Sequence, residues 1–126
     1  MGLLPVVYIA GPFRAPDAWQ REQNIRRAEE LALRVWRLGA VALCPHMNTR
    51  HFDGAAPDDV FLQGDLELLR RCDAVVCTVD WVLSTGARVE VDEAHRLGIP
   101  VFNAGALSRS ICRSWSEFER WLRGRT

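Results

Sequence analysis

Four short, uninterrupted apolar runs alternate along this chain with longer segments of helical periodicity. The apolar runs are Leu4 to Ala10, Ala40 to Leu43, Ala74 to Val79 and Ile99 to Phe102. Continuous runs of this length are typical of parallel strands that are covered on both faces, because a strand with one wet face alternates apolar and polar residues. The helical segments are 17–38, 58–71, 84–97 and a last one that begins at the capping box Ser114-Trp115-Ser116-Glu117 and runs to about Arg123.

This order predicts a three-layer α/β domain, in which an open parallel sheet with right-handed crossovers carries helices on both faces. A chain of 126 residues suffices for one such core, so we expect residues 1–126 to form a single domain. Ligands of open parallel sheets bind beyond the carboxyl ends of the strands. The segments that follow those ends are Gly11 to Arg14, Pro45 to Thr49 and Asp80 to Gly86, and we expect the functional residues to lie among them.

Composition narrows the possible functions. Sixteen basic residues balance sixteen acidic ones, and this zero net charge argues against a nucleic-acid polymer as partner. All of the basic residues are Arg, which excludes a lysine nucleophile or Schiff base. We find neither a membrane span nor a secretion signal, so we expect a cytoplasmic protein that binds no membrane. The cysteines lack C-x-x-C spacing and are expected to be buried thiols: Cys44, Cys72, Cys77 and Cys112.

Asp65 falls inside the apolar stripe of the segment 58–71. Residues at helical spacing define that stripe: Phe61, Leu62, Leu66, Leu68, Leu69 and Cys72. A carboxylate in such a stripe must be paired, hydrogen-bonded or protonated, because burial of a lone charge costs several kcal/mol. Periodicity leaves two interpretations open, a structural Asp that accepts hydrogen bonds from a loop and a functional carboxylate.

The segment 84–97 carries a second unusual carboxylate and a candidate anion site. Glu90 lies at the edge of the apolar side, where it is either a partly desolvated functional group or a solvated helix residue. Ser84 is suited to cap the helix, and Gly86 leaves room for a ligand at an N-terminus that favours phosphate. Since Ser84 and Glu90 are separated by about 9 Å along the helix axis, one sugar phosphate can bridge them. Simple capping by Ser84 is the alternative.

Four segments, Tyr8 to Phe13, Asp65 to Asp73, Ser84 to Glu90 and Ala94 to Val101, occur in an order and spacing that resemble the nucleoside 2-deoxyribosyltransferase family. The resemblance runs from Val7 to Phe102. It extends to one branch of that family, the nucleoside 5′-monophosphate N-glycosidases. It implies a flavodoxin- or Rossmann-like sheet with strand order 2-1-3-4, a small-molecule nucleotide substrate and a reaction without a cofactor.

The resemblance also implies residue roles. Glu90 matches the nucleophile that attacks C1′, Asp65 matches the acid/base carboxylate, and Tyr8 matches the tyrosine that orients the nucleophile. Ser84 stands where transferases that act on free nucleosides carry an Asp, which would repel a phosphate. The implied reaction is therefore hydrolysis of a nucleoside or deoxynucleoside 5′-monophosphate to a free base and a sugar 5-phosphate. Deoxyribosyl transfer between bases and a nucleotide-binding sensor without turnover are the alternatives.

The other candidate substrate ligands come from the three segments beyond the strands: Gly11, Phe13, Arg14, His46, Asn48, Trp81, Ser84 and Gly86. Arg14 is a candidate phosphate ligand or a solvated loop residue, and Arg21 either reaches the phosphate or extends along the surface. The segment 45–53 departs from the family pattern, and we expect it to contact the base. His46 and His51 lack a third ligand at suitable spacing, so we expect no metal.

Unburied aromatic and apolar side chains predict a homodimer or a higher homo-oligomer. Trp115 and Trp121 lie on a short C-terminal helix that cannot cover every large ring, and Val89 is expected to point outward. The family completes its site with a partner residue from beyond the last strand, in the region of Asn103, Ser108 and Ser110. We therefore expect a two-fold dimer with the helix after Ser84 near the symmetry axis.

Overall fold

The computed structural model describes residues 3–105 and 112–125, and its centre is a parallel sheet of four strands. The strands are β1 (Val6–Ala10), β2 (Val41–Leu43), β3 (Ala74–Cys77) and β4 (Val101–Asn103). Their order is β2-β1-β3-β4, and all three neighbouring pairs are parallel. The predicted fold class and strand order are thus confirmed.

Five α-helices and one 3₁₀ turn are present in the described part of the chain: α1 (Ala18–Arg37), α2 (Pro45–Asn48), α3 (Asp58–Arg70), η1 (Trp81–Leu83), α4 (Thr85–Arg96) and α5 (Trp115–Arg123). The four long helices begin and end within one or two residues of their predicted bounds. Sequence periodicity missed α2 and η1, because a single turn is too short to show a repeat. The one available signal was Pro45, since proline is favoured in the first helical turn.

Side-chain caps define where three of the helices begin. Asp17 accepts from the Gln20 amide at 2.8 Å and Ser84 accepts from the Ala87 amide at 3.1 Å. Ser114 and Glu117 form the reciprocal capping box that the sequence predicted.

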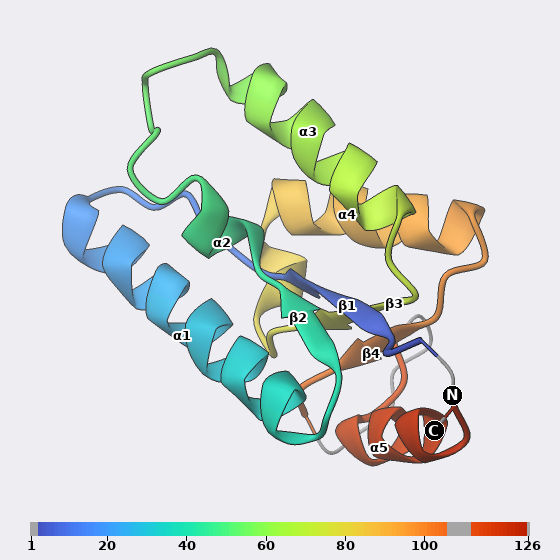
Figure 1. The fold of residues 1–126 in the computed structure, drawn as a ribbon. Helices are drawn as coiled ribbons and strands as arrows, with labels where there is room; N and C mark the ends of the chain where they lie inside the picture. Colours follow the sequence, from blue (N-terminus) through green and yellow to red (C-terminus); the bar gives the residue numbers. More distant parts are fainter. Residues whose placement is uncertain (1–2, 106–111, 126) are drawn as a thin grey trace.

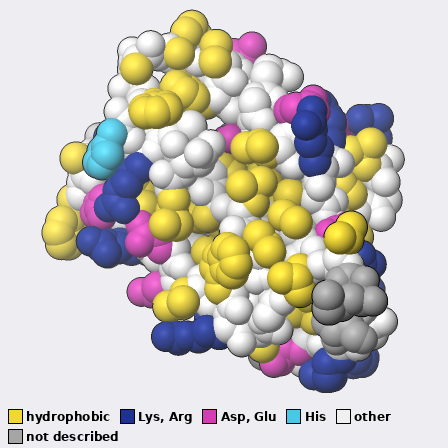
Figure 2. Space-filling model, viewed as in Figure 1, with side chains coloured by type: hydrophobic (Ala, Val, Ile, Leu, Met, Phe, Trp, Pro, Cys, Tyr) yellow, Lys and Arg dark blue, Asp and Glu magenta, His cyan; other side chains and the backbone are white. Residues whose placement is uncertain are grey.

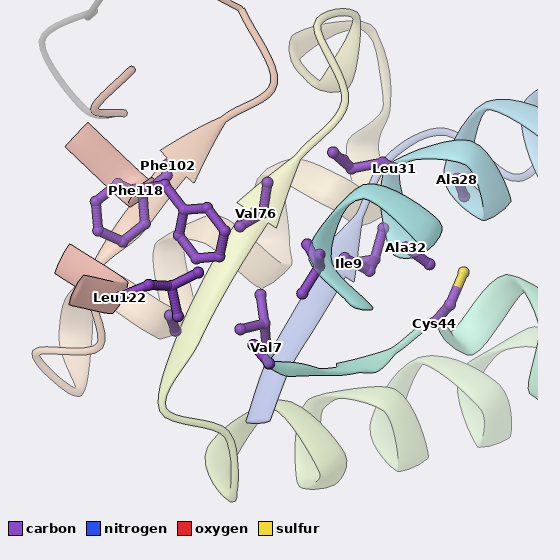
Figure 3. Close-up of a cluster of buried hydrophobic side chains, with 13 residues drawn as sticks. Val7, Ile9, Ala28, Leu31, Ala32, Cys44, Val76, Phe102, Phe118 and Leu122 are labelled. Atoms are coloured by element: carbon purple, nitrogen blue, oxygen red, sulfur yellow. The ribbon is translucent and has the colours of Figure 1, made fainter. Parts of the chain in front are cut away.

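Helices cover both faces of the sheet, as Figure 1 shows for α1 on one side and for the adjacent α3 and α4 on the other. Val7, Ile9 and Val76 point toward α1, while Phe102 packs against Phe118 of α5 (Figure 3). The opposite face packs against α3 and α4. Since successive strand residues point to opposite faces, Tyr8 between Val7 and Ile9 is directed toward α4.

The C-terminal helix corrects one expectation about aromatic exposure. Trp115 and Trp121 are half-buried, because both pack against the ring of Phe118. The exposed tryptophans lie instead on α1, where Trp19 is 70% exposed and Trp36 is 52% exposed. The packing of α5 therefore lends no support to an interface.

The structure also tests the expectation about the cysteines. All four cysteines are free and buried, as predicted. None of the helices in the described ranges is both long enough and apolar enough to cross a membrane.

Candidate active site

A cavity of about 640 Å³ opens beyond the carboxyl end of β1, between α3 and the beginning of α4. Residues from all three segments that follow the strands line it, as the strand order requires. The lining includes Gly11 to Arg14 after β1, Pro45 and His46 of α2, and Ser84 to Ala87 at the beginning of α4. In Figure 2 hydrophobic side chains cover much of the middle of the viewed face, while basic groups lie mainly toward its edges.

Glu90 lies on the wall of this cavity with its carboxyl group almost fully withdrawn from water. It occupies the second turn of α4, and its side chain is 8% exposed. The hydroxyl of Tyr8, a fully buried residue of β1, donates a hydrogen bond to Glu90 Oε2. The interpretation of Glu90 as a solvated helix residue is therefore wrong, because the helix turns this position toward the sheet.

Asp65 reaches the same cavity from α3. It is half-buried, and no hydrogen bond to its carboxylate is found among the described residues. A structural Asp held by a neighbouring loop thus has no support in the geometry. The two carboxyl groups interact, since the charge of Asp65 raises the pKa of both Glu90 and Tyr8.

Burial determines the protonation of these carboxyl groups. Desolvation raises the pKa of Asp65 to about 6. Desolvation, opposed by the Tyr8 hydrogen bond and reinforced by Asp65, raises the pKa of Glu90 to about 8. The roles implied by the family resemblance, an acid at Asp65 and a nucleophile at Glu90, would instead place the proton on Asp65. At neutral pH burial keeps Glu90 largely protonated, because desolvation outweighs the opposing hydrogen bond from Tyr8.

The first turn of α4 forms the part of the wall suited to an anion. Ser84 uses its hydroxyl to cap the helix, while helix geometry leaves the first amides of the turn without intrahelical partners. Gly86 borders open space, since a Cβ added there would meet only the Ser84 hydroxyl, at 3.9 Å. A phosphate could therefore approach this turn closely.

Phe13, Arg14 and His46 form the opposite side of the cavity. The rings of Phe13 and His46 are 5.8 Å apart with their planes at 63°, an edge-on contact. Burial lowers the pKa of His46, whose Nε2 lies 2.9 Å from the carbonyl of Pro12. Arg14 is exposed and pairs with Asp58 at 2.5 Å.

Three predicted ligands do not line the cavity. Asn48 is an exposed residue of α2, and Trp81 is buried in the core beneath α4. Arg21 pairs with Asp53 at 3.3 Å.

Asn103, a candidate for the residue shared between subunits, donates from Nδ2 to the Arg113 carbonyl and accepts from the Gly105 amide. Ser108 and Ser110, the other candidates for a residue shared between subunits, lie outside the described residues.

Sequence reasoning missed three acidic residues of the lining, Asp53, Asp58 and Asp59. Asp58 could have been found, because it is seven residues from Asp65 and shares its helix face. Asp53 lies in an irregular segment that has no periodicity to read. In the described ranges no three His, Cys, Asp or Glu side chains are grouped in a way that could hold a metal ion.

Solved structures with the same fold include two 2-deoxyribosyltransferases. The enzyme of the psychrotolerant bacterium Bacillus psychrosaccharolyticus is 21% identical, with a TM-score of 0.58 over 82% of this chain and 77% of that one. The enzyme of Leishmania mexicana is 19% identical, with a TM-score of 0.58 over 83% of this chain and 67% of that one. A conserved protein from Enterococcus faecalis V583 is 22% identical, with a TM-score of 0.67 over 84% of this chain and 66% of that one.

Sequence comparison adds one family. No curated protein matches the chain. Residues 5–104 match the model of a family that is described as "Domain of unknown function (DUF7768)". The matched range contains every residue of the cavity wall.

The raised pKa of Glu90 predicts how Glu90→Gln affects stability. The unfolded chain ionises Glu90 above about pH 4.5, whereas the folded chain keeps it protonated up to about pH 8. This contribution to stability is complete below pH 4.5 and is lost as pH rises through 8. Glu90→Gln should therefore match the unmodified protein near pH 5 and exceed it at pH 9 by on the order of 1–4 kcal/mol in urea unfolding.

The control is Asp92→Asn, which removes one negative charge from the exposed side of the same helix. It should show no comparable gain between pH 5 and pH 9. A gain for Glu90→Gln that does not change with pH would contradict the assignment of a buried, protonated carboxyl group.

Proposed function

The chain belongs to the DUF7768 family, and we propose that it hydrolyses the N-glycosidic bond of a nucleoside or deoxynucleoside 5′-monophosphate, yielding a free base and a sugar 5-phosphate. The observation that carries this proposal is a buried carboxyl group, Glu90, that accepts from Tyr8 in a cavity also lined by Asp65. A pair of carboxyl groups, one protonated and one ionised, is the usual arrangement for cleaving a glycosidic bond. The fold shared with two 2-deoxyribosyltransferases supports the same class of chemistry.

The proposed reaction begins with attack of a Glu90 oxygen on C1′ of the sugar. The new C1′–O bond forms as the C1′–N bond breaks, and the electron pair of that bond leaves with the base. Asp65 donates its proton to the departing base. Water then attacks C1′, Asp65 takes up the proton from this water, and Glu90 is released as a carboxylate. No redox group is needed, since each step moves only an electron pair and a proton.

The active form of the pair carries one proton. Near neutral pH the Glu90–Asp65 pair holds about one proton, which burial places mainly on Glu90. The productive arrangement has the same proton count, with the proton on Asp65 and the charge on Glu90. A sugar that becomes cationic at C1′ favours this arrangement, and the Tyr8 hydroxyl stabilises the Glu90 carboxylate by donating to it.

The 5′-phosphate is proposed to bind at the first turn of α4 and at Arg14. The helix N-terminus provides amides and a favourable dipole, and Gly86 leaves the approach open. Arg14 now pairs with Asp58 at the surface, where such a pair adds little to stability. Arg14 can therefore exchange Asp58 for a phosphate at little cost in free energy. Arg14 also balances part of the negative charge of the cavity wall.

Transfer of a deoxyribosyl group to a second base is the second candidate function. The observation that favours it is that two structures of the same fold are named as 2-deoxyribosyltransferases. A covalent sugar on Glu90 would serve both reactions, which differ only in whether water or a base attacks C1′.

We also propose that the protein acts as a homodimer built around the beginning of α4. Exposed apolar side chains occur between the end of β3 and the second turn of α4: Val79, Val82, Leu83 and Val89. Leu83 and Val89 also line the cavity, so a partner on this surface would cover the entrance to the site.

Product analysis tests the proposed reaction. The protein is incubated with nucleoside 5′-monophosphates, with and without an added acceptor base, and the products are separated by HPLC. Hydrolysis releases free base and sugar 5-phosphate, transfer yields a new nucleotide, and a sensor binds without yielding either. We expect hydrolysis, with a bell-shaped dependence of kcat/KM on pH whose limbs lie near 6 and 8, because only the singly protonated pair is active.

Variants in the same assay separate the two carboxyl groups. Glu90→Gln should lose at least about a thousandfold in kcat, because the nucleophile is removed. Asp65→Asn should lower kcat because an amide cannot donate the proton to the departing base. The loss of kcat should be smaller for a substrate whose base leaves readily, since such a base depends less on that proton. Asp92→Asn on the exposed side of α4 should keep full activity. Substantial activity of Glu90→Gln would remove Glu90 as the nucleophile.

The phosphate assignment predicts a strong preference for nucleotides. A nucleoside 5′-monophosphate should exceed its parent nucleoside by about a hundredfold or more in kcat/KM. Ser84→Asp should reverse this preference, because the new carboxylate repels the phosphate and can accept from a 5′-hydroxyl. Gln63→Glu, which adds the same charge outside the cavity wall, should leave it unchanged. Equal turnover of nucleotide and nucleoside by the unmodified protein would refute the assignment.

The dimer is tested by light scattering at assay concentration. Val82→Arg places a charge on the proposed interface without lining the cavity, so we expect it to yield monomers and to lower activity. Trp36→Arg, at an equally exposed site on α1, should stay dimeric and active. A fully active monomeric protein would disprove both the assembly and the shared entrance.

A further inference from the structure

Side chains from two helices hold three consecutive carbonyl groups of the loop that follows β1. The carbonyl of Pro12 lies 2.9 Å from His46 Nε2 of α2. The next two carbonyls, those of Phe13 and Arg14, accept from Nδ2 of Asn24 of α1, at 3.2 and 3.3 Å. A loop whose carbonyls are held in this way has little freedom to shift, although its side chains line the cavity.

Asn24 is the only polar residue among the buried residues of α1. Its Oδ1 accepts from Nη2 of Arg27 at 2.6 Å. Because a guanidinium can only donate, this contact orients the amide, so that the Asn24 NH₂ group faces the loop carbonyls. The Asn24 amide thus uses its acceptor on α1 and both donors on the loop.

Arg27 extends the connection to the loop that follows β3. Its Nε lies 3.6 Å from Oδ2 of Asp80, and Oδ1 of Asp80 accepts from the Thr78 hydroxyl at 2.6 Å. Thr78 packs closely on the loop after β1, since a Cβ added to Gly11 would lie 2.6 Å from its Oγ1. Asp80 immediately precedes η1, which leads to Ser84 at the beginning of α4. The chain of contacts therefore joins the two loops that carry opposite sides of the cavity.

We propose that Asn24, oriented by Arg27 and Asp80, is a positioning residue that holds Phe13 and Arg14 in place for binding of a nucleoside 5′-monophosphate. This inference rests on the proposed function, because it assigns Arg14 to the phosphate. Asn24 itself does not line the cavity, so it acts through the loop backbone and not by touching the substrate.

The substitution Asn24→Asp isolates this role. An aspartate has the same shape and keeps the acceptor for Arg27, but as a carboxylate it lacks the donors that the carbonyls of Phe13 and Arg14 require. The loop is then repelled where it was held, while the packing of α1 on the sheet is preserved. The substrates are the four deoxynucleoside 5′-monophosphates and their parent deoxynucleosides.

Asn24→Asp should raise KM for the best of these nucleotides about tenfold and change kcat less than twofold, because the two lost hydrogen bonds hold the loop and involve neither Glu90 nor Asp65. KM for the parent deoxynucleoside should change less than twofold, since Arg14 has no phosphate to bind there. In an Arg14→Ala background, Asn24→Asp should raise KM by less than a further twofold. Gln20→Glu, the same chemical change at an exposed position of α1, should leave both constants unchanged.

Different results would overturn the inference and the proposed function. If the unmodified protein cleaves nucleotides but Asn24→Asp keeps its KM, or if kcat falls while KM does not, Asn24 has no positioning role. Full additivity with Arg14→Ala would likewise overturn it. Absence of both cleavage and binding of every nucleotide by the unmodified protein would refute the proposed function, and the inference with it.

Discussion

The arrangement of the site depends on the burial of one carboxyl group against the sheet. Glu90 lies on the side of α4 that packs on β1, and the only residue of β1 that meets it with a polar group is Tyr8. Desolvation raises the pKa of Glu90, and the Tyr8 hydroxyl opposes that rise without cancelling it. The protein therefore keeps a carboxyl group in a place that is unfavourable for folding at high pH, as expected where chemistry needs a poised group.

The walls around this group come from elements that are far apart in sequence and are joined by polar contacts. Arg70 of α3 contacts Glu93 of α4 at 2.7 Å, beside the helix faces that carry Asp65 and Glu90. Asn24 and His46 hold the loop after β1 on the other side. The exposed Arg14–Asp58 pair, in contrast, is easily exchanged, so the wall combines rigid backbone with a cation free to change partners.

Most of the fold could be predicted because its signals are periodic. Continuous apolar runs marked the strands, and the 3.6-residue repeat marked the four long helices to within two residues. The same periodicity singled out Asp65 and Glu90 as carboxylates on apolar faces. It offered nothing for Asn48 and Trp81, whose side chains lie in single-turn segments, and both fall outside the cavity lining. Asp53 was missed because it lies in an irregular segment. The contacts of Asn24 were missed because the repeat of α1 does not show which loop carbonyls a side chain on that helix meets.

The apolar pattern predicted the strands, and the family resemblance implied their order. Helical spacing indicated which helix faces carry carboxylates, because helix geometry converts residue spacing into direction. The depth at which each carboxylate is buried depends on the assembled fold. Glu90 is covered more completely than Asp65, so its pKa is the higher of the two, although the roles implied by the resemblance place the proton on Asp65. Desolvation depends on every element packed around a group, and that sum is not contained in the spacing of residues along one helix.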